Sequence, residues 1–68
     1  MNLVFVISSN VSAIGYENGI IEVHFRNGSV YQYSNTSQRL FDEFFSSPSK
    51  GKFVHQRLKG RYPFQRIR

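Results

Sequence analysis

The sequence has no cysteine and only four acidic residues, and each shortage excludes a class of structure. Without thiols the chain forms neither disulfides nor the thiolate metal sites common in small domains. His24 and His55 stand far apart with no cysteine between them, which is not a zinc pattern. A chain of 68 residues buries only about 60% of its unfolded surface. Its stability must come from a dense aromatic core or from a second copy, and eleven aromatic residues favour the core.

Long hydrophobic segments are also missing. The apolar stretch Met1–Ile7 is too short to span a membrane and lacks the basic start of a signal peptide, so we interpret it as a first strand or a docking arm. No repeat, low-complexity segment or linker divides the chain, which predicts one domain over residues 1–68. We expect a soluble, cytoplasmic protein with no membrane partner.

Positive charge is abundant and unevenly placed. Seven of the nine Lys and Arg residues lie in Ser49–Arg68, a segment with no acidic residue, and the net charge is +5. Clustered cations repel one another, so such a segment favours an anionic partner. Aromatic residues stand among the cations, which points to a partner with phosphates and flat bases.

Two Asn-Gly pairs, Asn18-Gly19 and Asn27-Gly28, stand between short runs rich in β-branched and aromatic residues. This pattern is typical of β-hairpins. It predicts antiparallel strands near Ser12–Tyr16, Ile20–Arg26 and Ser29–Ser34.

The length of the second turn decides where Tyr31 and Tyr33 point, because a one-residue slip exchanges the faces of a strand. A two-residue loop would place both tyrosines with the polar residues of the preceding strand. A three-residue loop over residues 26–28 would instead place them opposite Val23 and Ile21 on the apolar face. The second register separates apolar from polar residues better, and we favour it. The same test prefers a two-residue loop for the first turn.

Two short helices are predicted after the strands. The first has Asn35, paired with Gln38, or alternatively Thr36 as its N-cap, and ends near Ser46. Four apolar residues fall on one stripe of this helix at helical spacing: Leu40, Phe41, Phe44 and Phe45.

The second helix is predicted to start at Ser47-Pro48 and to run to about Lys59, with Gly60 as its stop. Proline keeps Tyr62-Pro63-Phe64 extended. The predicted fold class is therefore α+β, a three- to four-stranded antiparallel meander followed by two short helices and an extended basic C-terminal segment.

Six short segments in this order and spacing resemble the KTSC domain family: Ile14-Gly15-Tyr16, Glu22-Val23-His24-Phe25, Asn27-Gly28, Tyr31-Gln32-Tyr33, Ser49-Lys50-Gly51-Lys52-Phe53 and Tyr62-Pro63-Phe64. The resemblance covers nearly the whole chain from Ser8 onwards. One departure is Ser37, where the family often has proline at the start of the helix.

The family takes its name from the C-terminal extension of some bacterial lysyl-tRNA synthetases and also occurs alone in bacterial and phage proteins. The resemblance implies no established activity. RNA binding is suggested for the family by its association with a tRNA-handling enzyme, which is an analogy rather than a mechanism.

Nothing in the sequence predicts catalysis. No spacing links one serine to His24 or His55 as nucleophile and base, and Asp42 and Glu43 are adjacent on a helix and so point apart. We therefore expect a protein that is not an enzyme, with no catalytic residue, no metal site and no cofactor.

The candidate phosphate contacts are the basic residues of the C-terminal segment, with Arg68 at its end: Lys50, Lys52, Arg57, Lys59, Arg61 and Arg66. The candidate stacking residues are Tyr31, Tyr33, Tyr62 and Phe64. Packing in the core is the alternative role for Tyr31 and Tyr33, and the favoured register supports this interpretation. For Ser49–Lys52 the alternatives are a phosphate-holding helix start and a solvated one.

Three functional hypotheses follow. The first is a non-enzymatic module that binds RNA or another nucleic acid, with Arg57, Lys59 and Arg61 on phosphates. The second is a homo-oligomer that captures a phosphorylated or cyclic nucleotide, as some small phage proteins do. The third is a protein-interaction domain that docks on an acidic partner.

Overall fold

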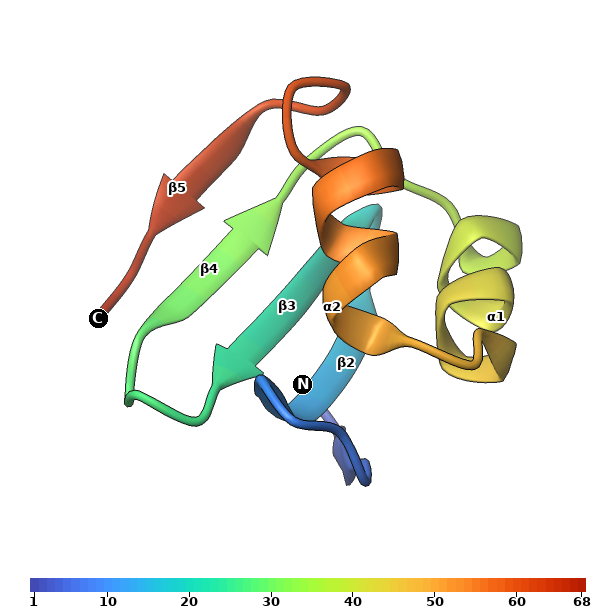
Figure 1. Ribbon diagram of the computed structural model, residues 1–68. Helices are drawn as coiled ribbons and strands as arrows, with labels where there is room; N and C mark the ends of the chain where they lie inside the picture. Colours follow the sequence, from blue (N-terminus) through green and yellow to red (C-terminus); the bar gives the residue numbers. More distant parts are fainter.

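The computed structural model describes all residues from Met1 to Arg68 and shows an α+β domain, as predicted. One antiparallel sheet contains five strands whose order across the sheet follows the chain. Both helical segments follow β4 in the sequence, precede β5, and lie against one face of the sheet (Figure 1). The sheet thus has one strand more than the most that the sequence predicted. The elements are β1 (Leu3–Phe5), β2 (Val11–Glu17), β3 (Ile20–Phe25), β4 (Val30–Tyr33), α1 (Gln38–Ser46), α2 (Lys50–Phe53), the π-helical turn η1 (Val54–Leu58) and β5 (Phe64–Arg66).

The first hairpin joins β2 and β3 through a two-residue loop, as predicted. Asn18 and Gly19 both have positive φ, 49° and 81°, and Glu17 pairs with Ile20 across the turn. These angles suit the right-handed twist of a hairpin, and asparagine and glycine adopt them at low cost. The turn therefore sets Tyr16 opposite Ile21 on the core face.

The second hairpin joins β3 and β4 through a three-residue loop. The Phe25 amide donates to the Ser29 carbonyl at 2.9 Å, and Gly28 takes a φ of 95°. This register sets Tyr31 opposite Val23 and Tyr33 opposite Ile21, which confirms the favoured alternative. Both tyrosines therefore lie on the face of the sheet that the helices cover.

The N-terminal stretch forms a strand, which decides between the two interpretations of Met1–Ile7. Leu3–Phe5 pairs with β2, and the Met1 amino group lies 3.1 Å from the Glu17 carboxylate. Gly15 permits this close packing, because a Cβ there would lie 2.8 Å from the Asn2 carbonyl oxygen.

The first helix ends at Ser46, as predicted, but the predicted N-cap was wrong. Ser37 is the N-cap, and its hydroxyl accepts the Leu40 amide at 3.1 Å. Asn35 takes a positive φ of 59°, and the Thr36 hydroxyl donates to the Gly19 carbonyl at 2.7 Å. Thr36 thus ties the segment to the first hairpin, and the next polar residue, Ser37, caps the helix.

The second helical segment starts two residues later than predicted. Ser49 is its N-cap, accepting the Lys52 amide at 3.3 Å, whereas the Ser47 hydroxyl donates to the Phe44 carbonyl at 2.8 Å and closes α1. The segment continues through η1 as far as Leu58, and Gly60 follows with a φ of 78°.

The C-terminal residues are not a free basic extension. Phe64–Arg66 forms the edge strand β5, which pairs Arg66 with Tyr31 and Phe64 with Tyr33. The backbone of Ile67 and Val30 continues the pairing at 2.7 Å. The extended conformation that Pro63 imposes therefore becomes part of the sheet.

The core lies between the helices and the sheet. Phe44 is fully buried and its ring lies 4.9 Å from that of Phe53, whereas Phe45 is half-exposed, so the predicted stripe of α1 is not buried along its whole width. The core cluster contains ten buried residues: Val11, Ile14, Ile21, Val23, Tyr33, Leu40, Phe44, Phe53, Val54 and Leu58. None of the helices has the length and hydrophobicity that a transmembrane span requires.

Candidate functional site

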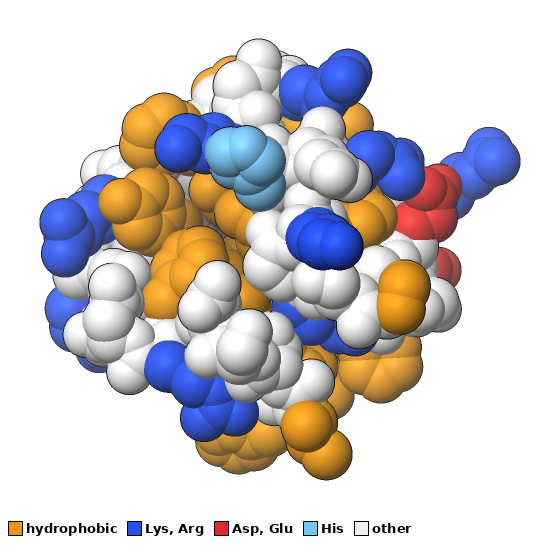
Figure 2. Space-filling view, viewed as in Figure 1, with side chains coloured by type: hydrophobic (Ala, Val, Ile, Leu, Met, Phe, Trp, Pro, Cys, Tyr) orange, Lys and Arg blue, Asp and Glu red, His pale blue; other side chains and the backbone are white.

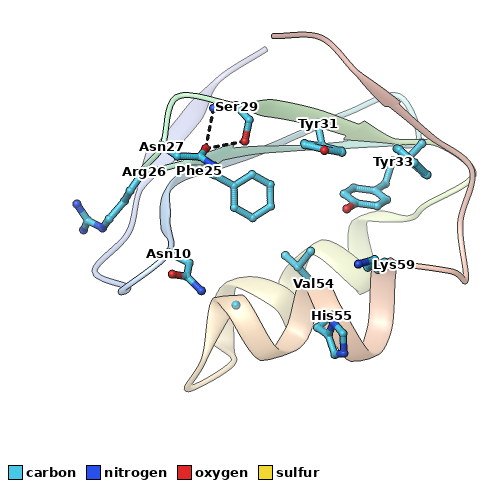
Figure 3. Close-up of a pocket in the computed structure, with 12 residues that line it drawn as sticks. Asn10, Phe25, Arg26, Asn27, Ser29, Tyr31, Tyr33, Val54, His55 and Lys59 are labelled. Atoms are coloured by element: carbon cyan, nitrogen blue, oxygen red, sulfur yellow. Dashed lines mark hydrogen bonds between the residues drawn. The ribbon is translucent and has the colours of Figure 1, made fainter.

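The largest hollow of the molecule opens between the helix-facing side of β3, β4 and β5 and the α2–η1 segment (Figure 3). Its volume is about 940 Å³. In Figure 2 an apolar surface lies at the bottom of this hollow, with a histidine and basic side chains around it. We call it the aromatic groove, and its lining residues are Asn10, Phe25, Arg26, Asn27, Ser29, Tyr31, Tyr33, Gly51, Val54, His55, Lys59 and Phe64.

The floor of the aromatic groove is a group of neighbouring rings that the sheet register assembles. Tyr31 and Tyr33 lie 6.4 Å apart between centroids with planes inclined by 19°. Phe64 lies 5.7 Å from Tyr31 and 6.1 Å from Tyr33, inclined by 31° and 39°. Phe25 meets Tyr31 edge-on at 5.7 Å and 88°. Two near-parallel tyrosine rings, a phenylalanine ring tilted against them and a fourth ring that meets Tyr31 edge-on make an aromatic surface on which a flat ligand can stack.

The rings of the floor differ in depth. Tyr33 is only 4% exposed and belongs to the core cluster, whereas Tyr31 is half-buried and Phe64 is 59% exposed. Burial, with a smaller contribution from Tyr31, raises the pKa of the Tyr33 hydroxyl above its usual value. That hydroxyl points into the groove on the side of Val54. Tyr33 is therefore packed in the core, whereas the ring of Tyr31 remains partly accessible.

The walls of the aromatic groove carry positive charge and no acidic side chain. Lys59 and His55 come from the α2–η1 side, and Arg26 comes from the turn between β3 and β4. The wall includes a π-helical turn, closed by the Lys59 amide on the Val54 carbonyl at 2.7 Å. Such turns are frequent at functional sites.

Few of the cations have a carboxylate partner. Glu43 contacts Arg57 at 2.8 Å and Arg39 at 3.9 Å, and no other Lys or Arg forms an ion pair. Glu17 contacts the N-terminal amine, and Glu22 contacts His24. Seven basic side chains thus have no Asp or Glu partner: Arg26, Lys50, Lys52, Lys59, Arg61, Arg66 and Arg68. Two of them donate from Nε to main-chain oxygens, Arg26 to that of Ser8 at 2.6 Å and Arg66 to that of Arg68 at 3.1 Å.

The structure separates the predicted phosphate contacts. Lys59 lines the aromatic groove, and Arg66 belongs to the strand beside it, opposite Tyr31. Arg57 instead contacts Glu43 and lies 4.9 Å from the centre of the Phe53 ring. It lines a second, smaller hollow of about 240 Å³ together with Lys52.

The remaining predicted residues are dispersed. The Lys50 ammonium group donates to the Ser47 carbonyl at 2.7 Å, and Arg61 donates to the Gln56 carbonyl at 3.0 Å. Tyr62 packs against the core cluster and does not line the aromatic groove. Of the predicted stacking residues, the groove therefore contains Tyr31, Tyr33 and Phe64.

Sequence reasoning missed several residues of the groove. His55 was assigned no role, Asn10 and Arg26 were not considered as site residues, and Gly51 entered only as part of the Ser49–Lys52 stretch. The alternation along β3 already placed Phe25 on the core face, so that ring could have been found. The others come from separate loops and a helix, which no local pattern brings together.

The opposite face of the sheet carries a separate polar cluster. The Glu22 carboxylate lies 2.6 Å from His24 Nε2 and accepts a hydrogen bond from Gln32 at 2.7 Å. Burial raises the pKa of Glu22, but the hydrogen bonds from Gln32 and His24 and the charge of His24 outweigh it, so the pKa is lowered overall. This cluster ties β3 to β4 away from the aromatic groove.

Nothing in the molecule points to catalysis. The Ser29 hydroxyl in the groove donates to the Asn27 side chain at 2.7 Å, and no serine hydroxyl bonds a histidine side chain. No group of three or more His, Asp or Glu residues is placed to hold a metal ion. What the site presents chemically is a set of flat apolar rings with cations at its edge.

Comparisons with known proteins agree with this fold. A KTSC domain protein from Yersinia pestis has a crystal structure that superposes with a TM-score of 0.90 at 34% identity, covering 98% of this chain and 97% of that one. The lysine–tRNA ligases of Trichormus variabilis and a Nostoc species are 30% and 28% identical over 47 residues. The chain matches over 69% of its own length but only 8% of theirs. The KTSC domain profile matches residues 7–62, and the chain therefore belongs to the KTSC domain family.

Proposed function

We propose that this domain is a non-enzymatic module that binds single-stranded RNA or another single-stranded nucleic acid. The observation that carries the proposal is the combination of an aromatic floor with exposed cations that have no carboxylate partner. Proteins that bind single strands combine these two features, a positive groove for the backbone and rings for the bases. The similarity to a segment of lysine–tRNA ligases is consistent with an RNA ligand.

The cations nearest the aromatic groove are the proposed phosphate contacts. Arg26 and Lys59 line it, and Arg66 adjoins it on β5. Each phosphate contact to a single strand contributes about 0.7 to the slope of log affinity against log salt, so three contacts give a slope of about −2. Affinity is therefore expected to fall about 20-fold between about 50 mM and about 200 mM salt.

The test is fluorescence anisotropy with labelled single-stranded RNA, duplex RNA and DNA at these two salt concentrations. Replacing Arg26, Lys59 and Arg66 together by alanine is expected to reduce the slope by about 2. Arg57→Ala is the matched control, because Glu43 already holds that guanidinium, and it is expected to leave the slope unchanged. Absence of binding at low salt, or a wild-type affinity indifferent to salt, would refute the proposal.

The size of the aromatic groove favours one alternative, a site for a free phosphorylated or cyclic nucleotide. A volume of about 940 Å³ lies within the range of small-ligand pockets, about 300–1,000 Å³. In this case calorimetry should give a fixed stoichiometry and light scattering a dimer or larger species. A monomer that prefers long strands to mononucleotides would exclude it.

Docking on an acidic protein is the remaining proposal, and a complex that resists nuclease treatment would support it.

A further inference from the structure

The floor of the aromatic groove is suited to one flat ring rather than to a row of bases. The rings of Tyr31, Tyr33 and Phe64 all lie within 6.4 Å of one another, so they form one patch instead of a track along the sheet. Tyr33 closes the patch on the side of the core, and the half-exposed Phe64 leaves it open at the β5 edge. A planar group can therefore enter from that edge and stack on Tyr31 and Phe64.

The groove also offers unused polar groups at its margin. The Asn10 side-chain amide lines the groove, makes no hydrogen bond within the chain, and has both a donor and an acceptor. Gly51 leaves room for it, since a Cβ at that position would lie 3.3 Å from Asn10 Nδ2. An amide of this kind can pair with the edge of a base.

The charge around the patch selects the chemistry of the ligand. Lys59 and Arg26 stand on the walls, Arg66 lies across from Tyr31, and no acidic residue lines the groove. A neutral flat ring attached to phosphates complements this arrangement, because the ring covers the aromatic floor while the phosphates meet the cations. A nucleobase with its own backbone phosphates has this combination.

We propose that the aromatic groove seats a single unpaired nucleobase of a bound strand, stacked on Tyr31 and Phe64, with the flanking phosphates on Lys59 and Arg66. The inference rests on the proposed function and deepens it. It implies that base-bearing strands bind more tightly than a bare sugar–phosphate chain. Removing one stacked base from such a site costs about 5- to 150-fold in affinity.

The experiment compares a labelled single-stranded RNA with an abasic ribose–phosphate oligomer of equal length, and adds a free mononucleotide as competitor. The wild-type domain is expected to bind the RNA about 5- to 150-fold more tightly than the abasic oligomer. Tyr31→Leu and Phe64→Leu keep apolar volume but remove the ring, and each is expected to bring this ratio towards one. Phe64 is 59% exposed, so its variant tests the proposal even where Tyr31→Leu unfolds. Phe45→Leu, a half-exposed ring on α1, is the matched control and should leave the ratio unchanged.

The outcomes separate this inference from the proposed function. The single-nucleobase site is refuted if the wild type binds both oligomers equally, or if both Leu variants keep the wild-type ratio of RNA affinity to abasic-oligomer affinity. Nucleic-acid binding itself stands in either case. A free mononucleotide that competes as well as the strand, at an equal concentration of bases, would also refute the single-nucleobase site, because the ligand would then be the free nucleotide. Binding of neither oligomer at low salt would remove the proposed function itself.

Discussion

Replacing Phe44 by alanine is expected to remove a large part of the stability of this domain. Phe44 is 0% exposed, and its ring stacks on Phe53 at 4.9 Å in the centre of the core. Truncating a buried phenylalanine costs about 3–5 kcal/mol. For 68 residues the whole free energy of unfolding is about 3–10 kcal/mol, at about 0.05–0.15 kcal/mol per residue. The variant should therefore lose at least about a third of the unfolding free energy, and all of it if the wild type lies at the low end of that range.

The assay is urea denaturation followed by far-ultraviolet circular dichroism, with Phe45→Ala as the matched control. Phe45 is the next residue of α1 but is 49% exposed, so its truncation is expected to cost about 1 kcal/mol or less. If the alanine variant is too unfolded to show a folded baseline, Phe44→Leu is expected to lose less stability and so to remain measurable. An equal loss for Phe44→Ala and Phe45→Ala would refute the reasoning, because it would mean that a second copy covers the exposed face of α1.

Two further predictions concern the sheet. The pKa of Glu22 is lowered in the folded state, so its contribution is present above the usual value of 4.5 and is lost as the pH falls through the folded pKa. Urea titrations from about pH 6 to about pH 3 should show this loss in the wild type and a flatter profile in Glu22→Gln, and parallel profiles would contradict it. Gly28→Ala meets no atom within 4 Å, so its expected cost of about 1–2 kcal/mol comes only from the positive φ of 95°. An unchanged unfolding free energy for this variant would contradict the three-residue loop.

Much of the sheet could be predicted because its determinants are local. Asn-Gly turns require backbone angles that few residues adopt, and alternation fixes one register per turn. The placement of Tyr31 opposite Val23 therefore followed from the sequence and was confirmed. The caps were harder, since Thr36 and Ser47 could each cap a helix but bond instead to the carbonyls of Gly19 and Phe44. The choice among neighbouring polar residues depends on contacts that the sequence does not show.

The sequence also shows how charged and aromatic residues are distributed along the chain, but it does not show how they are arranged in space. The basic C-terminal segment was read as one patch, whereas the fold turns Arg57 towards Glu43 and Lys59 towards the aromatic groove. Residues two apart on a helix point to nearly opposite sides, and this helix also ends between Arg57 and Lys59, at Leu58. A patch in sequence is thus a patch in space only where the spacing of its residues matches the period of the backbone.

The sequence by itself determined the fold class, the two hairpin registers, the excess of unpaired cations and the family. The first three follow from composition, turn chemistry and alternation, which act over a few residues, whereas the family follows from the six segments that resemble the KTSC domain. The tertiary structure decided that the C-terminal segment becomes β5, and thereby that Phe64 joins Tyr31 and Tyr33 in one floor. It also decided that His55 and Lys59 face that floor. A pairing between a C-terminal strand and one formed thirty residues earlier depends on the packing of everything between them, and only the folded chain contains that information.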